Sequence, residues 1–277
     1  MTSPKTWMIT GAGRGLGRAL ALAALDQGHA VVATVRGDHD LPVHERLDVQ
    51  TLDVRDPRAA HDAVGRAAAR MGAVDVLVNN AGHGLVGAVE EVSEDDVRAV
   101  VETNLLGPLW LTRAVIPVMR AQGSGHVVQI STVGAVGTMP MLGVYCSTKW
   151  GLEAFSEAMA GEVRSMGIRV TIVEPGALDT DWAGSSMRFS SPHPAYDHVR
   201  AEVFGTEEVP WPPSDAHGGT TPEQAAAAIL EHVAAPDDGR LRVLVGEDAP
   251  GQVRAALDLR TEDYSKDPIY RGGEIAP

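Results

Sequence analysis

The amino-acid sequence predicts an α/β fold, a single doubly wound domain built on a mostly parallel seven-stranded sheet. Two observations carry this prediction. Short runs rich in β-branched residues alternate with segments rich in Ala, Leu, Glu and Arg, which is the order of βαβ units. Most of the short runs are apolar on both faces, as are strands buried inside a parallel sheet. No repeat of 20–50 residues and no linker within the first 180 residues is visible, so we expect one domain over residues 1–277.

The expected elements follow one another along the chain. The strands are predicted at Thr6–Thr10, Ala30–Val35, Leu47–Val54, Val74–Asn79, His126–Ser131, Ile168–Val173 and Leu241–Val245. The helices between them are predicted at Leu16–Gln27, Pro57–Met71, Glu94–Met119 and Val144–Met166. A later helix opens at Thr221-Pro222-Glu223, which supplies an N-cap and a proline at the first helical position. The polar tail, residues 249–277, is expected to pack loosely.

The composition excludes several classes of partner. Thirty-seven acidic and twenty-three basic residues give a formal charge of −14, which disfavours binding to nucleic acid or to an anionic membrane. The single cysteine, Cys146, cannot form an internal disulfide, which fits a reducing compartment. The first five residues lack the apolar core of a signal peptide, and the longest uncharged stretch, 121–148, is broken by glycines and a proline. We therefore expect a soluble, cytoplasmic protein.

A glycine-rich loop joins the first strand to the first helix. Its sequence is TGAGRGLG, in which Thr10, Gly11, Gly13, Arg14, Gly15, Leu16 and Gly17 are candidate cofactor-binding residues. Glycines at this place let the backbone approach a pyrophosphate, whose charge the helix N-terminus favours. The spacing is T-G-x-x-x-G-x-G and not G-x-G-x-x-G. The loop predicts a Rossmann-type dinucleotide site because it lies between a strand and a helix at the start of the βαβ series.

The end of the second strand bears on the choice of cofactor. An NAD site places an acidic residue about 20 residues beyond the glycines, where it binds the adenosine ribose. Here the strand ends in Ala-Thr-Val-Arg36, without an acid. Arg36 and Arg14 could instead hold a 2′-phosphate, since guanidinium groups bind phosphate well. The alternative is that both are solvated surface arginines. We favour the phosphate-binding interpretation and predict NADPH/NADP⁺ as the cofactor.

A tyrosine and a lysine form the candidate catalytic pair. Tyr145 and Lys149 lie four residues apart at the start of a predicted helix, and therefore on one face. An ammonium beside a phenol is expected to lower the phenol's pKa from its usual value near 10, which gives an acid able to protonate a carbonyl oxygen. With four tyrosines and only three lysines in 277 residues, about 0.04 such pairs are expected by chance.

Taken together, these motifs resemble those of the short-chain dehydrogenase/reductase family from about Thr6 to Thr180. The resemblance implies three further cofactor contacts: Asp53-Val54 with adenine, Asn80-Ala81-Gly82 in the family's N-N-A-G motif, and Pro175-Gly176 with Thr180 at the nicotinamide amide. It also implies that Asn104 distorts a helix and helps to hold a proton-relay water, and that Lys149 holds the nicotinamide ribose. Family members are commonly dimers or tetramers, so a homodimer or homotetramer is expected.

The sequence departs from the family pattern at the catalytic serine. That serine is usually found thirteen residues before the tyrosine, a position that Thr132 occupies here, with Ser131 one residue earlier. Successive residues of a strand face opposite sides, so we expect only one of the two hydroxyls to reach the substrate. We favour Thr132, which supplies the same donor, and keep Ser131 as the alternative.

These residues predict an NADPH-dependent reduction of a ketone or aldehyde with Tyr145 as general acid. A proline- and aromatic-rich insertion at 181–220 predicts a substrate lid, with a surface excursion or an oligomer contact as the alternative. Together with the family resemblance, this lid favours a bulky apolar carbonyl substrate. Two other functions stay open: NAD(P)-dependent oxidation of an alcohol, and a non-catalytic NADP-binding regulator. The ten histidines show no metal-ligand spacing, so no catalytic metal is expected.

Overall fold

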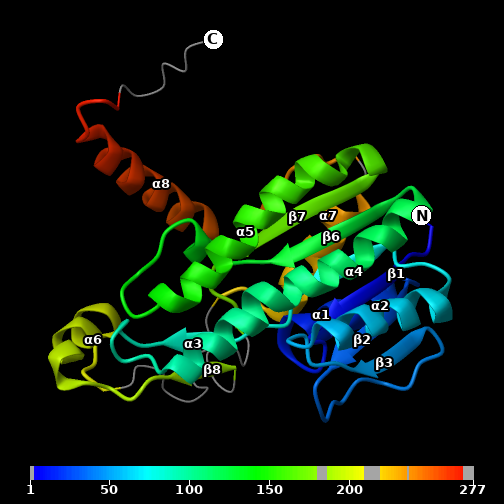
Figure 1. Ribbon diagram of the computed structural model, residues 1–277, viewed down its shortest axis with the longest axis horizontal. Helices are drawn as coiled ribbons and strands as arrows, with labels where there is room; N and C mark the ends of the chain where they lie inside the picture. Colours follow the sequence, from blue (N-terminus) through cyan, green and yellow to red (C-terminus); the bar gives the residue numbers. More distant parts are fainter. Residues whose placement is uncertain (1–2, 180–185, 209–218, 236, 271–277) are drawn as a thin grey trace.

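The computed structural model describes residues 3–179, 186–208, 219–235 and 237–270. Its centre is a seven-stranded sheet in the order β3-β2-β1-β4-β6-β7-β9 (Figure 1). The strands are β1 (Thr6–Thr10), β2 (Ala30–Val35), β3 (Leu47–Thr51), β4 (Val76–Asn79), β6 (Gly125–Ile130), β7 (Ile168–Pro175) and β9 (Arg242–Val245). All six pairings are parallel, which confirms the predicted doubly wound α/β sheet. The winding reverses between β1 and β4, the place where such sheets form a ligand crevice.

Helices cover both faces of the sheet. On one face lie α1 (Gly15–Asp26) and α7 (Pro222–Ala234); on the other lie α2 (Pro57–Met71), α4 (Gly107–Gln122) and α5 (Gly143–Val163). Alternate residues of β1 divide between the two cores: Trp7 and Ile9 pack with α1 and α7, whereas Met8 packs with α2 and α4. This double burial explains why the strands are apolar on both faces.

The predicted helix Glu94–Met119 is divided in two. Helix α3 (Glu94–Val101) passes into a π-helical turn, Glu102–Leu106, before α4 begins. Pro108 has no N–H to donate to the carbonyl oxygen of Asn104, so the α-helical pattern cannot continue there. Gly107 instead donates to the carbonyl oxygen of Glu102, five residues back. The turn widens the helix at Asn104.

The segment predicted as an irregular lid contains regular structure in its described parts, 186–208 and 219–220. A short strand, β8 (Met187–Phe189), pairs in parallel with β5 (Gly84–Val86), and a 3₁₀ turn (Pro194–Tyr196) leads into α6 (Asp197–Phe204). Neither β5 nor β8 was predicted, because three residues are too few to show an alternating pattern. Residues 181–185 and 209–218 of this lid lie outside the described residues.

The C-terminal segment is a helix, where the sequence predicted only a loosely packed tail. Helix α8 (Ala249–Ser265) extends away from the sheet in Figure 1, and Ala249 is its one buried residue. Two 3₁₀ turns, Val133–Ala135 and Arg164–Met166, complete the described elements. Residues 271–277 of the tail lie outside the described part.

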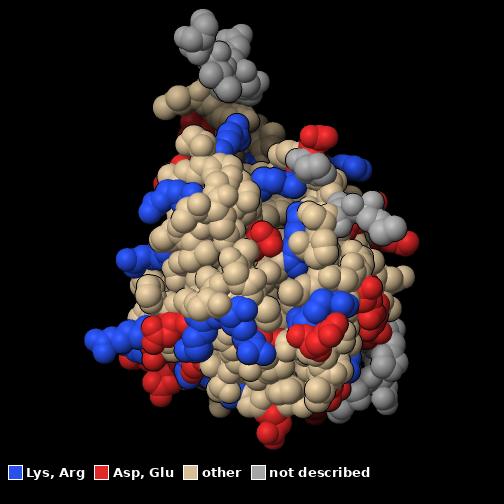
Figure 2. Space-filling model, turned by 90° about the vertical axis from the view of Figure 1, so that its right-hand side faces the viewer, with Lys and Arg blue, Asp and Glu red and all other residues tan. Residues whose placement is uncertain are grey.

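The described surface carries both signs of charge. On the face shown in Figure 2, which is the side of the N terminus, Lys and Arg side chains are interspersed with Asp and Glu. Within the described ranges, no helix is both long enough and apolar enough to cross a membrane.

Candidate active site

A cleft of about 630 Å³ runs along the carboxyl ends of β1, β2, β4, β6 and β7. It gathers residues that are far apart in the sequence. The predicted site residues that line it are Gly11, Gly13, Arg14, Gly15, Leu16, Arg36, Asp53, Val54, Asn80, Ala81, Gly82, Ser131, Thr132, Tyr145, Lys149, Pro175 and Gly176. Three others, Thr10, Gly17 and Asn104, lie outside this lining, and Thr180 lies outside the described residues.

Thr10 and Gly17 lie outside the cleft lining and pack the glycine loop against the loop that contains Asn80. The Thr10 hydroxyl accepts hydrogen bonds from the backbone N–H of Asn80 (2.9 Å) and of Ala81 (3.0 Å). The Asn80 side chain donates to the carbonyl oxygen of Thr10 at 2.9 Å. A Cβ atom at Gly17 would lie 2.5 Å from both Asn80 Nδ2 and the carbonyl oxygen of Gly11. The loop after β1 is thereby fixed against the loop after β4.

The N-terminus of α1 is suited to an anion. Helices α2, α3 and α7 are capped by the side chains of Asp56, Ser93 and Thr221. Helix α1 has no capping side chain and no acidic residue in its first turn. Its first backbone N–H groups therefore lack a capping side chain at the place where the glycine loop opens onto the cleft. The arrangement fits a pyrophosphate.

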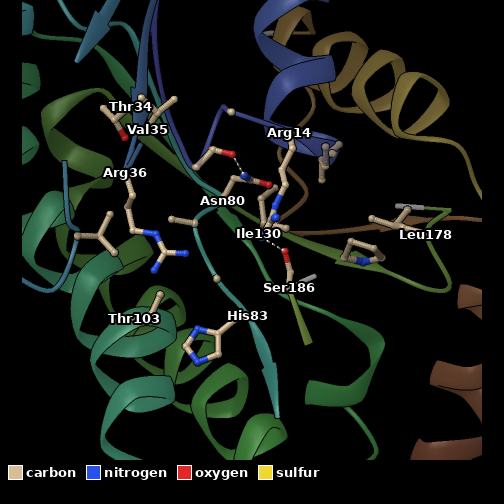
Figure 3. A pocket seen from close by; sticks show the side chains of 18 of the residues that line it. Arg14, Thr34, Val35, Arg36, Asn80, His83, Thr103, Ile130, Leu178 and Ser186 are labelled. Carbon is tan, nitrogen blue, oxygen red and sulfur yellow. Dashed lines mark hydrogen bonds between the residues drawn. The ribbon is translucent and has the colours of Figure 1, made fainter. Parts of the chain in front are cut away.

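The two candidate phosphate-binding arginines both reach the cleft. The Arg36 guanidinium, directly after β2, points into it (Figure 3). Arg14 reaches toward the lid segment and donates to the hydroxyl of Ser186 at 2.6 Å. Asp38 also lines this end. The Asp53 carboxylate accepts hydrogen bonds from Arg55 at 2.6–3.0 Å, which lowers the pKa of that carboxyl.

The candidate catalytic hydroxyls meet where β6 ends beside α5. Tyr145 is 5% exposed, and a hydrogen bond joins its phenolic hydroxyl to the hydroxyl of Thr132. Thr132 Oγ1 in turn accepts from the backbone N–H of Gly134 at 3.2 Å. The neighbouring Ser131 donates to Glu153 Oε1 at 2.5 Å and makes its contact on the other side of the chain.

The pKa of Tyr145 departs from the expectation. Burial is the main influence and raises this pKa well above its usual value, whereas the hydrogen bond from Thr132 acts in the opposite direction. The lowering by Lys149 that the sequence suggested is absent here, because the Lys149 ammonium donates to the carbonyl oxygen of Ile130 at 2.8 Å. Burial lowers the pKa of Lys149 to about 8, opposed by the charge of Glu153.

Asn104 holds the loop that follows Gly82. Its Oδ1 accepts from the backbone N–H of His83 at 3.0 Å, and its Nδ2 donates to the His83 carbonyl oxygen at 2.9 Å. Asn104 is fully buried in the π-helical turn. The helix distortion expected at this residue is present, and the side chain itself is used to hold the loop.

His83 and Ser186 line the cleft as well, and no sequence motif predicted either of them as a site residue. His83 follows Gly82 directly, a position compatible with both a pocket wall and a solvated loop. Burial, then the charges of Arg188 and Arg36, lower its pKa to about 4, so the ring is neutral at physiological pH. Its Nε2 is buried and makes no hydrogen bond. Ser186 precedes β8, an element that was not predicted.

The described residues contain no group of three or more His, Cys, Asp or Glu side chains able to hold a metal ion.

Comparisons with known proteins agree with this geometry. The sequence model of the short chain dehydrogenase family matches residues 5–189. The oxidoreductase BOA17 of Botryotinia fuckeliana is 39% identical over 271 residues, covering 95% of this chain and 96% of the relative.

Two solved structures share the fold. A short-chain dehydrogenase from Streptomyces avermitilis superposes with a TM-score of 0.84 at 36% identity, covering 95% of this chain and 96% of that one. An alcohol dehydrogenase from the archaeon Thermococcus sibiricus, complexed with 5-hydroxy-NADP, has a TM-score of 0.69 at 26% identity, covering 88% and 97% of the two chains. The chain is thus a member of the short-chain dehydrogenase family, oxidoreductases that work with NAD(P).

Proposed function

We propose that the protein reduces the carbonyl group of a ketone or aldehyde to an alcohol, with NADPH as cofactor and Tyr145 as general acid. The observation that carries the proposal is the pairing of the Thr132 and Tyr145 hydroxyls at the inner end of the cleft. When bound, the nicotinamide cofactor supplies the hydride.

The protein's own residues bind the carbonyl group and supply the proton. The hydroxyls of Thr132 and Tyr145 donate hydrogen bonds to the substrate oxygen, so both stabilise the negative charge that develops there. Tyr145 then gives up its proton. The burial that raises the pKa of Tyr145 keeps the phenol protonated before the reaction, which is the form that a general acid needs. Asn104 fixes the loop at His83, and Lys149 is hydrogen-bonded to the carbonyl oxygen of Ile130. We propose that Lys149 also binds the ribose of the nicotinamide nucleotide.

The preference for NADPH over NADH rests on Arg36 and Arg14. Both side chains line the cleft, Arg36 lies directly after β2 where the 2′-phosphate is expected, and β2 ends without an acidic residue. In the free protein Arg14 is bonded to Ser186, so we propose that the cofactor phosphate replaces this hydroxyl as its partner. The NADP derivative bound by the Thermococcus sibiricus enzyme supports the same choice.

The proposed substrate is bulky and apolar. Side chains of the lid segment, Phe189, Tyr196 and Phe204, pack with Met141 and Met187 into one apolar cluster.

Oxidation of an alcohol with NADP⁺ uses the same residues in reverse and is the second candidate function. A non-catalytic NADP-binding regulator would need neither Tyr145 nor its hydrogen bond to Thr132. We further propose a cytoplasmic homodimer or homotetramer, which sedimentation or size-exclusion measurements can test.

The test is a panel of ketones, aldehydes and alcohols assayed with each cofactor. We expect sustained NADPH oxidation with at least one bulky carbonyl compound. Tight NADPH binding without turnover on any compound would favour the regulator, and turnover with alcohols alone would favour the oxidation.

A further inference from the structure

Two buried carboxyl groups and an exposed arginine lie behind the catalytic pair, on the side of β6 to which Ser131 points. Glu153 is one turn beyond Lys149 on α5 and is 6% exposed. Glu174, in β7 directly before Pro175, is 1% exposed. Arg242 opens β9, the neighbouring strand. Three secondary-structure elements therefore bring two carboxyl groups and one guanidinium together beneath the cleft.

The contacts within this group link it to the catalytic strand. Ser131 donates to Glu153 Oε1 at 2.5 Å. Arg242 Nε lies 3.5 Å from Glu153 Oε2 and 3.2 Å from Glu174 Oε1. The other end of the Arg242 guanidinium pairs with the exposed Glu157 at 2.7 Å. Glu153 is thus held from two sides, and it fixes the residue next to Thr132.

The same carboxylate acts on Lys149. The Lys149 ammonium is buried, and it donates a hydrogen bond to a neutral carbonyl group, that of Ile130. A buried ammonium loses its proton readily unless a negative charge is nearby. Glu153 supplies that charge, and its effect is to raise the pKa of Lys149 against the lowering caused by burial. The charge of Lys149 also contributes to lowering the pKa of His83, whose ring is neutral.

We propose that Glu153 is a positioning residue that holds Ser131 and keeps the neighbouring Lys149 ammonium charged, while Glu174 and Arg242 hold Glu153 in place. This role rests on the proposed function, in which a charged Lys149 contacts the nicotinamide ribose. It extends the catalytic pair on α5 to a third residue on the same helix, spaced four residues further along the chain.

Glu174 makes this arrangement sensitive to pH. Burial, then the adjacent Glu153 charge, raise the pKa of Glu174 to about 7, against the opposing charge of Arg242. The pair therefore holds one proton below neutral pH and releases it above. The groups that face the pair are Lys149 and Glu157 from α5, Ser131 from β6 and Arg242 from β9.

The test observes Lys149 directly. The chain has only three lysines, so ¹³C labelling of the lysine side chains gives three resonances, which Lys5→Arg and Lys266→Arg variants assign. We expect the Lys149 titration in Glu153→Gln to move to lower pH by about one unit, because the amide keeps the contact with Ser131 but removes the charge. The matched control is Glu157→Gln, which removes the same charge from the same helix and from the same arginine. Its Lys149 titration should stay at the wild-type midpoint.

A Lys149 midpoint that is the same in Glu153→Gln and wild type would overturn the proposal. If Glu153→Gln does not fold, the wild-type protein still tests the proposal. Ionisation of the Glu153–Glu174 pair should give the titration curve of the Lys149 resonance a second inflection near pH 7. A single inflection would then contradict the proposal. The titration needs neither substrate nor cofactor, so a wild type that reduces no carbonyl compound would refute the proposed function and leave this result unaffected.

Discussion

Ser131 and Thr132 are neighbours in the chain, and their hydroxyls have different partners: Ser131 donates to Glu153, whereas Thr132 is hydrogen-bonded to Tyr145. The backbone at Thr132 is extended, with φ −169° and ψ 153°, so successive side chains point to opposite sides. The Ser131 hydroxyl therefore contacts the buried Glu153, and the Thr132 hydroxyl lies beside the phenol of Tyr145. This division underlies the assignment of Thr132 to the substrate oxygen.

The two hydroxyls should respond differently to removal. Thr132→Val should lower kcat by about 10²-fold, the usual loss for one preorganised donor to a developing oxyanion. Ser131→Ala should lower it by about tenfold or less, since it affects the site only through Glu153. Steady-state kinetics of both variants checks this prediction. A severe loss in Ser131→Ala with none in Thr132→Val would reverse the assignment.

Removal of the Arg36 guanidinium should weaken the binding of one cofactor selectively. Arg36→Ala should raise the KM for NADPH by about 10- to 100-fold, because a charge-assisted contact with the 2′-phosphate is lost. The KM for NADH, which has no such phosphate, should change little. Arg98→Ala, at a side chain that is 72% exposed on α3, is the control and should leave both values as they are. Equal losses for the two cofactors would contradict the role of Arg36.

Gly17 tests the packing behind the glycine loop. A methyl group there would lie 2.5 Å from both Asn80 Nδ2 and the carbonyl oxygen of Gly11. The backbone atom cannot move away without shifting the loop, so Gly17→Ala should destabilise the fold by about 1–3 kcal/mol. The matched control is Gly65→Ala in α2, where nothing lies within 4 Å and alanine favours the helix. Thermal unfolding should show a lower Tm for the first variant and an equal or higher Tm for the second. Equal Tm values would show that the loop can relax.

Glu174 should make stability fall as the pH rises. Its pKa is about 7 in the folded protein and 4.5 when unperturbed, so the folded state holds the extra proton between these values. The stability that this proton gives is full below about pH 4.5 and is lost as the pH rises through about 7, and Glu174→Gln removes this dependence. We expect the Tm of Glu174→Gln relative to wild type to increase from pH 5 to pH 8. The same comparison for Glu157→Gln should show no such trend, and a flat difference for Glu174→Gln would contradict the prediction.

The sequence was sufficient for the sheet and for most of the cleft lining. Strands buried on both faces are continuous apolar runs, and the glycine loop, Arg36 and the Tyr145–Lys149 pair each lie in short, dense motifs. These features are local in the chain, so pattern and spacing reveal them.

What the sequence did not predict depends on contacts between distant segments. The pairing of β5 with β8 joins residues about one hundred positions apart. The Glu153–Ser131 contact and the Arg14–Ser186 contact likewise need the folded chain. The π-helical turn at Asn104 had a local cause in Pro108, but one proline near a helix start is also compatible with an ordinary first turn. The raised pKa of Tyr145 follows from burial, which no spacing reveals.

The most direct test of the proposed function compares wild type with Tyr145→Phe in carbonyl reduction with NADPH. The substitution removes the phenolic hydroxyl and keeps the buried ring, so the affinity for NADPH, measured by fluorescence titration, should change little. We predict that kcat falls by about 10²- to 10⁴-fold, the contribution of a positioned general acid. A Tyr145→Phe variant that reduces the same substrate at the wild-type rate would contradict the account.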